Sequence, residues 1–152
     1  MFKKFLFYII CLAPWFLSSI IPVDYNYYDT INLPFFAPGN WFYMIVWPIV
    51  YILLAFNLYS LFKEISFKDI PWSYKISLII NYIFNQGYTL VAFGLKNNFL
   101  GFVFCLGNLI SLLFLYEETY QLKTSKIKLL WPYIAISMFA VILSFSIYII
   151  NL

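Results

Sequence analysis

The chain has 152 residues, of which 64% are hydrophobic and only 10% are charged, and its formal net charge is +3. A soluble domain has about 25% charged residues, so this composition excludes an ordinary soluble enzyme and indicates an integral membrane protein. The length allows one domain, 1–152. The small positive charge is no signal of nucleic-acid binding.

The charged residues lie around five long apolar stretches. All nine basic residues are lysines, and alternate gaps between the stretches hold only Lys96. The remaining lysines are Lys3, Lys4, Lys63, Lys68, Lys75, Lys123, Lys126 and Lys128. Short Lys-rich loops stay on the cytoplasmic side because their translocation is costly. The pattern therefore predicts five spans, with the N-terminus inside and the C-terminus outside.

The first span is predicted over 5–21. Its Lys-rich start is typical of a signal peptide, but the apolar run is long and no small-residue cleavage pattern precedes Pro22. We therefore expect a retained helix. An outer loop follows over 23–40, rich in turn formers and aromatic residues. A loop of this length is often functional, for example as a lid; the alternative is a belt of interfacial aromatic side chains.

The other spans are predicted over 41–62, 72–95, 99–116 and 127–150. A helix needs about 20 residues to cross the hydrocarbon core, and these ranges are close to that length. Glu117 and Glu118 end the fourth span, which indicates that its helix projects into the cytoplasm. Pro132 lies in the first turns of the fifth, where proline is tolerated. The predicted fold class is an all-α bundle of five transmembrane helices.

Aromatic side chains form a stripe on the second span. Tyr43, Trp47 and Tyr51 are four residues apart, so they share one helical face. Pro48 follows Trp47 and can kink the helix or open it locally. Such a face is expected either to pack against a neighbouring helix or to form one wall of an aromatic pocket.

Three amides lie close together on the third span. Asn81 and Asn85 are four residues apart, and Gln86 follows directly. A polar side chain in hydrocarbon is costly unless it is paired, so these residues indicate either hydrogen bonds between helices or a cavity. Facing the aromatic stripe, they would supply the few fixed polar groups of a small-molecule site.

Small and weakly polar faces on the last two spans favour packing between helices. They consist of Gly101, Cys105, Asn108 and Ser111 on the fourth span, and Tyr133, Ser137, Ala140 and Ser144 on the fifth.

The sequence also lacks residue types that several functions require. No Asp, Glu, Lys or Arg lies near the middle of a span, which disfavours proton-driven transport and intramembrane hydrolysis. The chain has no histidine and only two cysteines, Cys11 and Cys105. We therefore expect no metal site and no cofactor, and we interpret both cysteines as small hydrophobic residues.

Ordered motifs along nearly the whole chain carry a resemblance to a known family. They are Tyr28, Leu33-Pro34, Pro38-x-x-Trp41, Val46-Trp47 and Tyr51; then Asn81-Tyr82-Ile83-Phe84-Asn85-Gln86; then Trp131-Pro132-Tyr133, Phe139-Ala140, Leu143-Ser144 and Tyr148 before Asn151. In this order and spacing, the chain resembles the TspO/MBR family of bacterial tryptophan-rich sensory proteins and mitochondrial translocator proteins.

The resemblance implies a five-helix bundle, commonly a homodimer, whose pocket lies under the first loop and binds porphyrins or other flat hydrophobic molecules. With Tyr43 from the aromatic stripe, the pocket candidates are Trp47, Tyr51, Asn81, Phe84, Asn85, Gln86, Phe104, Cys105, Ala140 and Leu143. The lid candidates are Tyr28, Pro34 and Pro38.

The chain departs from the family pattern at several places. Leu33 stands where the first loop usually has lysine, and Gly39 where it has a second proline. Phe104 occupies about the place of an acidic residue found in many bacterial members, and Ile136 that of the fifth-helix tryptophan. A pocket with one tryptophan fewer disfavours Trp-dependent, light-driven porphyrin breakdown and indicates an altered ligand preference.

The functional expectation is a membrane receptor or sensor that binds a tetrapyrrole. Trp47 and Tyr51 would stack on the ligand, and Asn81 and Gln86 would hydrogen-bond its polar edge. The alternatives are a porphyrin-degrading enzyme that uses Trp47 and a facilitator of tetrapyrrole or lipid movement. The expected partners are a porphyrin or similar small molecule, membrane lipids and a second copy, in a bacterial cell membrane.

Overall fold

The structure, a computed structural model, describes residues 2–124 and 126–152. The side chain of Lys3, one of the lysines that predict the membrane orientation, lies outside the described part. All regular structure within this part is helical. In chain order, the elements are α1 Phe2–Leu12, η1 Ala13–Ile20, η2 Tyr25–Thr30, α2 Asn40–Glu64, α3 Trp72–Thr89, η3 Leu90–Gly94, α4 Asn98–Gln121, η4 Ile127–Leu130 and α5 Trp131–Ile150.

Local sequence explains several helix boundaries. Pro14 lies at the start of η1, where its missing N–H group coincides with the change from α-helix to a tighter 3₁₀-helix. The side chain of Asn97 accepts a hydrogen bond from the backbone N–H of Leu100 and caps α4. Pro132 occupies the first turn of α5, as the sequence predicts. The helix of the fourth span continues to Gln121, beyond the predicted span end, also as expected.

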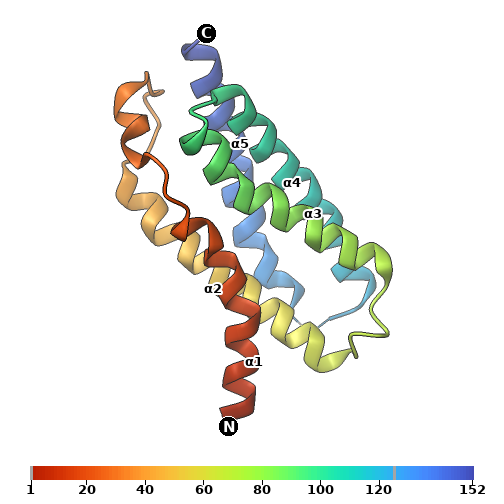
Figure 1. Ribbon diagram of the computed structural model, residues 1–152. Helices are drawn as coiled ribbons and strands as arrows, with labels where there is room; N and C mark the ends of the chain where they lie inside the picture. The colour runs from red at the N-terminus through yellow and green to blue at the C-terminus, as the bar shows by residue number, and fades with distance from the viewer. Residues whose placement is uncertain (1, 125) are drawn as a thin grey trace.

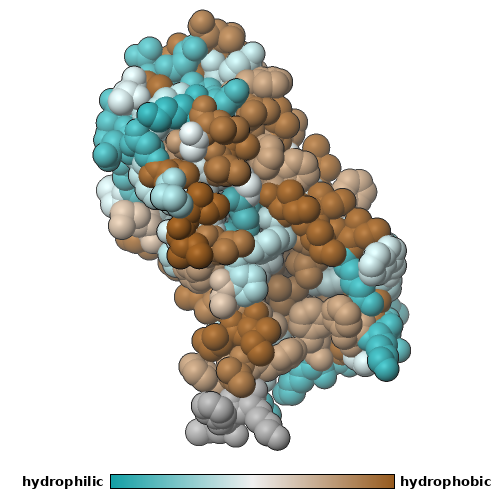
Figure 2. Space-filling model, viewed as in Figure 1, coloured by the Kyte–Doolittle hydropathy of each residue, from teal (hydrophilic) through white to brown (hydrophobic). Residues whose placement is uncertain are grey.

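Within the described residues, four helices are long and apolar enough to cross a membrane: Asn40–Glu64, Trp72–Gly94, Asn98–Gln121 and Ile127–Ile150. They correspond to the second to fifth predicted spans. The apolar helix Lys4–Ile20 is shorter, so the first span, and with it the count of five, stays a prediction. On the face drawn in Figure 2, hydrophobic residues form a broad band between two more polar ends.

The helices form a ring in the order α1, α2, α5, α4, α3, and η1 closes the ring by packing on α3. Figure 1 shows the first loop, the α3–α4 connection and the C-terminus at one end of the bundle, which we call the C-terminal end. The N-terminus lies at the opposite, N-terminal end, on the side of the α2–α3 and α4–η4 loops. These two loops carry or flank the predicted cytoplasmic lysines from Lys63 to Lys128, and Lys96 lies at the C-terminal end.

The distribution of polarity is the reverse of that in a soluble bundle. Isoleucines on the outer face of α3, such as Ile79 and Ile83, are more than half exposed. Polar side chains are instead buried inside the ring: Asn57, Asn81, Asn85, Gln86, Asn108, Ser111, Thr119, Ser137 and Ser144 are among them. A hydrocarbon surrounding explains this pattern, because only the interior offers hydrogen-bond partners to polar groups.

Candidate functional site

Aromatic rings from three helices meet inside the ring of helices. The Trp47 ring lies 5.7 Å from that of Tyr51 and 6.3 Å from that of Tyr133, measured between centroids. On the other side of Tyr51, the ring of Trp15 from η1 lies 6.1 Å away. Tyr51, Tyr133 and Trp15 are buried, and Trp47 is partly buried. Because 47 and 51 are one helical turn apart, both rings of α2 point to the same interior volume.

Hydrogen bonds of Asn85 connect this aromatic cluster to α3. The Tyr51 hydroxyl donates to Asn85 Oδ1 at 3.0 Å, and Asn85 Nδ2 donates to the Tyr133 hydroxyl at 2.9 Å. Gln86 Nε2 donates to the same Asn85 oxygen at 2.7 Å. One amide of α3 thus joins α2 to α5.

Gln86 holds the backbone of η1. Its Nε2 donates to the carbonyl oxygen of Trp15 at 3.0 Å, and its Oε1 accepts from the backbone N–H of Ser18 at 2.8 Å. The Tyr82 hydroxyl donates to the Pro14 carbonyl oxygen at 3.0 Å. The first helix is therefore fixed to α3 by backbone groups that its change of helix type makes available.

A second amide pair connects α3, α4 and α5. Asn81 Nδ2 lies 3.2 Å from Asn108 Oδ1 and 3.1 Å from the Asn108 carbonyl oxygen. The Tyr133 hydroxyl lies 2.7 Å from Asn108 Oδ1 and 3.2 Å from Asn81 Oδ1. Asn108 Nδ2 donates to Ser137 Oγ at 3.1 Å. Tyr133 is therefore shared by both amide groups, and the polar network reaches α2, α3, α4, α5 and η1.

The network has a clear structural consequence. The three amides that the sequence singles out form hydrogen bonds with neighbouring helices, so their packing role is directly visible. A ligand that used Asn81 or Gln86 would have to exchange some of these bonds for its own. In a low-dielectric interior each such bond is strong, and an unpaired buried group is costly.

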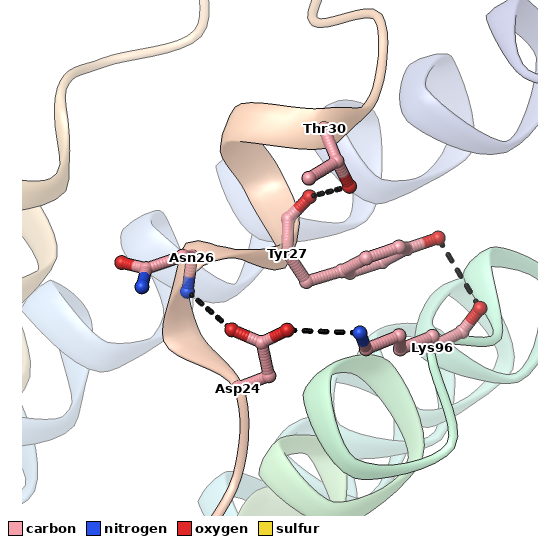
Figure 3. Close-up of polar contacts among 5 residues, drawn as sticks. All are labelled: Asp24, Asn26, Tyr27, Thr30 and Lys96. Carbon is pink, nitrogen blue, oxygen red and sulfur yellow. Dashed lines mark hydrogen bonds and ion pairs between the residues drawn. The ribbon is translucent and has the colours of Figure 1, made fainter.

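The first loop is anchored to the α3–α4 connection. Lys96 Nζ forms an ion pair with Asp24 Oδ2 at 2.8 Å, and the Tyr27 hydroxyl donates to the Lys96 carbonyl oxygen at 3.2 Å (Figure 3). Tyr27 also lies 3.1 Å from Asn98 Oδ1. The Lys96 ammonium group donates to the Asp24 carboxylate and holds its pKa below the usual value.

The same loop is attached to the end of α5. The backbone N–H of Asn32 donates to Asn151 Oδ1 at 2.9 Å, and Asn151 Nδ2 returns a bond of 2.8 Å to the Asn32 carbonyl oxygen. These paired bonds, together with the Lys96 contacts, hold both halves of the loop across the C-terminal end. The arrangement is that of a closed cap.

Under this cap, Tyr28 points into the bundle. Its hydroxyl lies 2.5 Å from that of Tyr88, and its ring lies 4.7 Å from that of Phe93 in the π-helical turn η3. A void of about 10 Å³ remains here, with space for about one water molecule; Tyr28, Tyr88, Ala92, Asn98, Gly101, Ser144 and Ile147 line it. A porphyrin is far larger, so its binding requires side chains or helices to move.

The remaining predicted site residues lie at different depths of the bundle. Phe84 and Phe104 lie at the seam between α3 and α4, with ring centroids 5.4 Å apart. Cys105 and Leu143 are buried, whereas Tyr43 and Ala140 are partly buried. In the loop, Pro34 is buried and Pro38 partly buried. The structure thus brings Trp47 and Tyr51 together with Asn85 and Gln86, and it does not place all pocket candidates around one open cavity.

Sequence reasoning omitted several residues of this site. Tyr88 lies seven residues after Asn81 and on the same helical face, so its contact with the loop carried a usable signal. Tyr133 and Asn108 appear only as packing residues in the sequence pattern, although they form the centre of the network. Trp15 and Ser18 contribute backbone groups to the hydrogen bonds with Gln86, and a pattern of side chains in the sequence cannot predict such bonds.

The described residues offer limited covalent chemistry. Within residues 2–124 and 126–152, no group of three or more His, Cys, Asp or Glu side chains is placed to hold a metal ion. The interior groups are aromatic rings, amides and hydroxyls. Such groups suit the stacking and hydrogen bonding of a flat molecule.

Comparison with known proteins agrees with this architecture. The sequence profile of the TspO/MBR family matches residues 6–149. The chain belongs to the TspO/MBR family. The match covers the aromatic cluster, the amide network and the first loop, so the motifs that carry the resemblance lie in elements that this family shares.

Three relatives show how similar the chain is to other TspO/MBR proteins. A tryptophan-rich protein TspO of Bacillus cereus is 33% identical over 138 residues, which cover 90% of this chain and 89% of the relative. An uncharacterized membrane protein, YtaB, of Bacillus subtilis is 30% identical and covers 88% and 85%. A TspO of Archaeoglobus fulgidus is 27% identical and covers 83% and 80%. The chain is therefore a membrane protein of this family.

Proposed function

We propose that this TspO/MBR protein is a membrane receptor or sensor for a flat hydrophobic ligand of the porphyrin class, bound inside the helix bundle under the first loop. The observation that carries the proposal is the convergence of Trp47, Tyr51 and Tyr133 beside Asn85. Stacked rings with a few fixed polar groups are the usual design of a small-molecule site. The closed cap over this end of the bundle supports a ligand that is shielded from water.

The test is titration of protoporphyrin IX into the purified protein in detergent, in the dark, followed by tryptophan fluorescence and porphyrin absorbance. We expect saturable quenching that weakens in Trp47→Phe, because this ring faces the interior. Trp41→Phe is the matched control: it removes a tryptophan from the same helix at a position that is 66% exposed. Absence of saturable binding in the unchanged protein would overturn the proposal.

Illumination of the complex tests the enzymatic alternative. The same interior tryptophan would then assist photo-oxidative breakdown of the bound porphyrin. A receptor should give stable porphyrin spectra in the light, whereas light-dependent bleaching that is lost in Trp47→Phe and kept in Trp41→Phe would favour the enzyme. Uptake of porphyrin into protein-containing vesicles would favour the facilitator instead.

We also propose a fifth span and a defined orientation. A 3₁₀-helix rises about 2.0 Å per residue and an α-helix about 1.5 Å, so α1 and η1 together extend roughly 32 Å. This length matches a hydrocarbon core of about 30 Å, although the residue count is low. The lysine-rich N-terminal end would face the cytoplasm.

Labelling with a membrane-impermeant maleimide tests this orientation in intact cells. We expect Asn26→Cys in the first loop to react and Lys68→Cys in the α2–α3 loop to react only after permeabilisation. The reverse pattern would contradict the orientation. Reaction of both sites in intact cells would place both loops on the outer side of the membrane. That result would contradict an odd number of spans between the two labelled loops.

A homodimer is the proposed assembly, in line with the family resemblance. Light scattering of the detergent-solubilised protein should give twice the mass of the 152-residue chain. A monomeric mass across the concentrations used for porphyrin binding would contradict it.

A further inference from the structure

An apolar groove of about 330 Å³ lies between α2 and α5, away from the void under the first loop. All of its lining residues are apolar: Phe42, Val46, Ile49 and Val50 from α2, and Pro132, Ala135 and Ile136 from α5. Ile49 is 50% exposed and Val50 only 2% exposed. One side of the groove thus faces the surroundings of the bundle, and the other reaches the core.

The groove coincides with the least connected seam of the ring. Among the described residues, no direct hydrogen bond joins α2 to α5, and the ring pairs between them are Trp47–Tyr133 and Phe42–Phe139. Each other neighbouring pair has a side-chain hydrogen bond: Tyr8 to Ile52, Gln86 to Ser18, Asn81 to Asn108, and Asn108 to Ser137. Parting α2 from α5 in hydrocarbon therefore separates mainly apolar surfaces. The polar link that would have to give way is the indirect one through Asn85 of α3, which bonds both Tyr51 and Tyr133.

Residues adjacent in sequence line the groove and form the interior aromatic cluster. There are three such pairs of consecutive residues. In each pair, the first residue lines the groove and the second belongs to the cluster. The pairs are Val46–Trp47, Val50–Tyr51 and Pro132–Tyr133. A small separation of the two helices would connect the groove to the cluster directly.

Helix α2 has a flexible point beside the groove. Pro48 lies inside the helix between Val46 and Val50. Its ring removes the N–H that would bond the carbonyl of Met44, and helices bend at such positions. The part of α2 before Pro48 can thus move relative to the part after it without breaking a regular backbone hydrogen bond at residue 48.

The opposite route, through the cap, is polar and firmly held. Opening the first loop would break the Asp24–Lys96 ion pair, the bonds of Tyr27 and the paired bonds between Asn32 and Asn151. A hydrophobic ligand also partitions into the bilayer rather than into water. Both facts favour the apolar seam over the cap.

We infer that the α2–α5 groove is the passage through which the hydrophobic ligand enters the bundle from the bilayer and leaves it. This inference rests on the proposed function. Val46, Ala135 and Ile136 form the opening, and Pro48 lets the α2 wall move. The residues that line the opening are all apolar, so it favours a flat molecule whose faces are largely apolar.

The test measures exchange rates of protoporphyrin IX in the full-length protein reconstituted into vesicles. Association is followed by tryptophan quenching, and release by transfer to an excess of empty vesicles. Ala135→Phe fills the groove from outside the interior cluster, and Ala135→Leu fills it less. We expect Ala135→Phe to slow both rates by about tenfold, which corresponds to about 1.4 kcal/mol of added barrier, to leave Kd unchanged, and Ala135→Leu to give an intermediate slowing.

Two further variants complete the test. Ala13→Phe is the matched control, because Ala13 is an exposed alanine of η1 and lies outside the groove. Ile136→Ala widens the opening and should accelerate both rates. An unchanged Kd in the slowed variants also shows that the interior is folded.

The outcomes separate the two proposals. Saturable binding with rates that Ala135→Phe and Ile136→Ala leave unchanged would overturn entry by the groove and keep the receptor. Faster exchange in Asp24→Asn together with unchanged rates in Ala135→Phe would show entry under the cap, and it would also overturn the groove. A change of Kd through the release rate alone would show that Ala135 contacts the bound ligand and would contradict a pure entry role. Absence of saturable binding in the unchanged protein would overturn both.

Discussion

Tyr133 has one hydroxyl group within hydrogen-bond distance of three amides. It accepts from Asn85 Nδ2 and has a single proton to donate, for which Asn108 Oδ1 at 2.7 Å competes with Asn81 Oδ1 at 3.2 Å. The residue is 1% exposed, so water is no substitute partner. A rearrangement at this hydroxyl would therefore be transmitted to α3 and α4 together.

Replacement of Tyr133 by Phe should lower the free energy of unfolding by about 1–3 kcal/mol, because it leaves buried amide groups unpaired while keeping the ring. Thermal unfolding in detergent measures the change. Tyr148→Phe is the control on the same helix: Tyr148 has a ring contact with Phe99, and its hydroxyl forms no hydrogen bond with any residue that the structure describes. Equal stability of the two variants would show that the network contributes little.

At the contact between α3 and α4, a glycine on each helix leaves space for a phenylalanine ring of the other helix. A Cβ atom at Gly107 would lie 2.5 Å from a ring atom of Phe84, and one at Gly87 would lie 2.5 Å from a ring atom of Phe104. We expect Gly107→Ala to destabilise the protein by about 1–3 kcal/mol through overpacking. The double variant with Phe84→Leu should recover part of the loss, and Gly101→Ala, whose Cβ would meet Ala92 at an ordinary 3.4 Å, should change little. Additive losses in the double variant would contradict this explanation.

At the scale of elements, the first helix changes from α to 3₁₀ geometry at Ala13, and Gln86 satisfies backbone groups in the tighter part. Just beyond Gln86, where α3 ends, the π-helical turn η3 places Phe93 against Tyr25 and Tyr28 of the loop. Both irregular segments therefore pack against a neighbouring element on one side. Irregular helical backbone inside a membrane protein is tolerated where protein groups satisfy it.

Loss of the Gln86 side-chain bonds should loosen η1 specifically. In Gln86→Leu, the N–H of Ser18 and the carbonyl of Trp15 lose their partners, so we expect hydrogen exchange at the Ser18 amide to become at least about tenfold faster. The matched control is Gln121→Leu, since Gln121 bonds only to Glu117 at an exposed helix end. Unchanged exchange at Ser18 would show that η1 is held by ring packing instead.

At the scale of the whole molecule, the C-terminal end is closed by contacts between segments far apart in the chain. Asp24 and Lys96 are 72 residues apart, and Asn32 and Asn151 are 119 residues apart. The α2–α5 seam has no comparable polar bonds in the described part of the chain. The bundle is thus held firmly at its polar cap and more loosely along one apolar side.

The ion pair of the cap should respond to pH in a defined direction. The pKa of Asp24 is held below its unfolded value of about 3.9 by the hydrogen bond from Lys96. Its stabilising effect is therefore present above the unfolded pKa and is lost as the pH falls through the lowered folded pKa. Carbon NMR titration of the Asp24 carboxyl should give a lowered pKa that rises in Lys96→Met; an equal pKa in both proteins would contradict the pairing.

The membrane class, the boundaries of most helices and the face on which Trp47 and Tyr51 lie could be predicted from local sequence alone. This was possible because helical periodicity and the cost of placing charge in hydrocarbon act on local stretches of chain. The sequence also predicted that Asn85 and Gln86 would be paired or line a cavity. The length of the first helix was less predictable, because its second half is 3₁₀ and reaches further with fewer residues.

The tertiary structure decided which groups pair. That Tyr133 serves both Asn85 and Asn108, that Gln86 binds the backbone of η1, and that α2 and α5 alone lack a hydrogen bond among the described neighbouring helices depend on the relative rotation and depth of separate helices. Lipid is as apolar as the outer faces, so hydropathy does not fix these rotations. They follow from the interior polar groups, whose partners lie up to 119 residues away in sequence and become neighbours only when the ring closes.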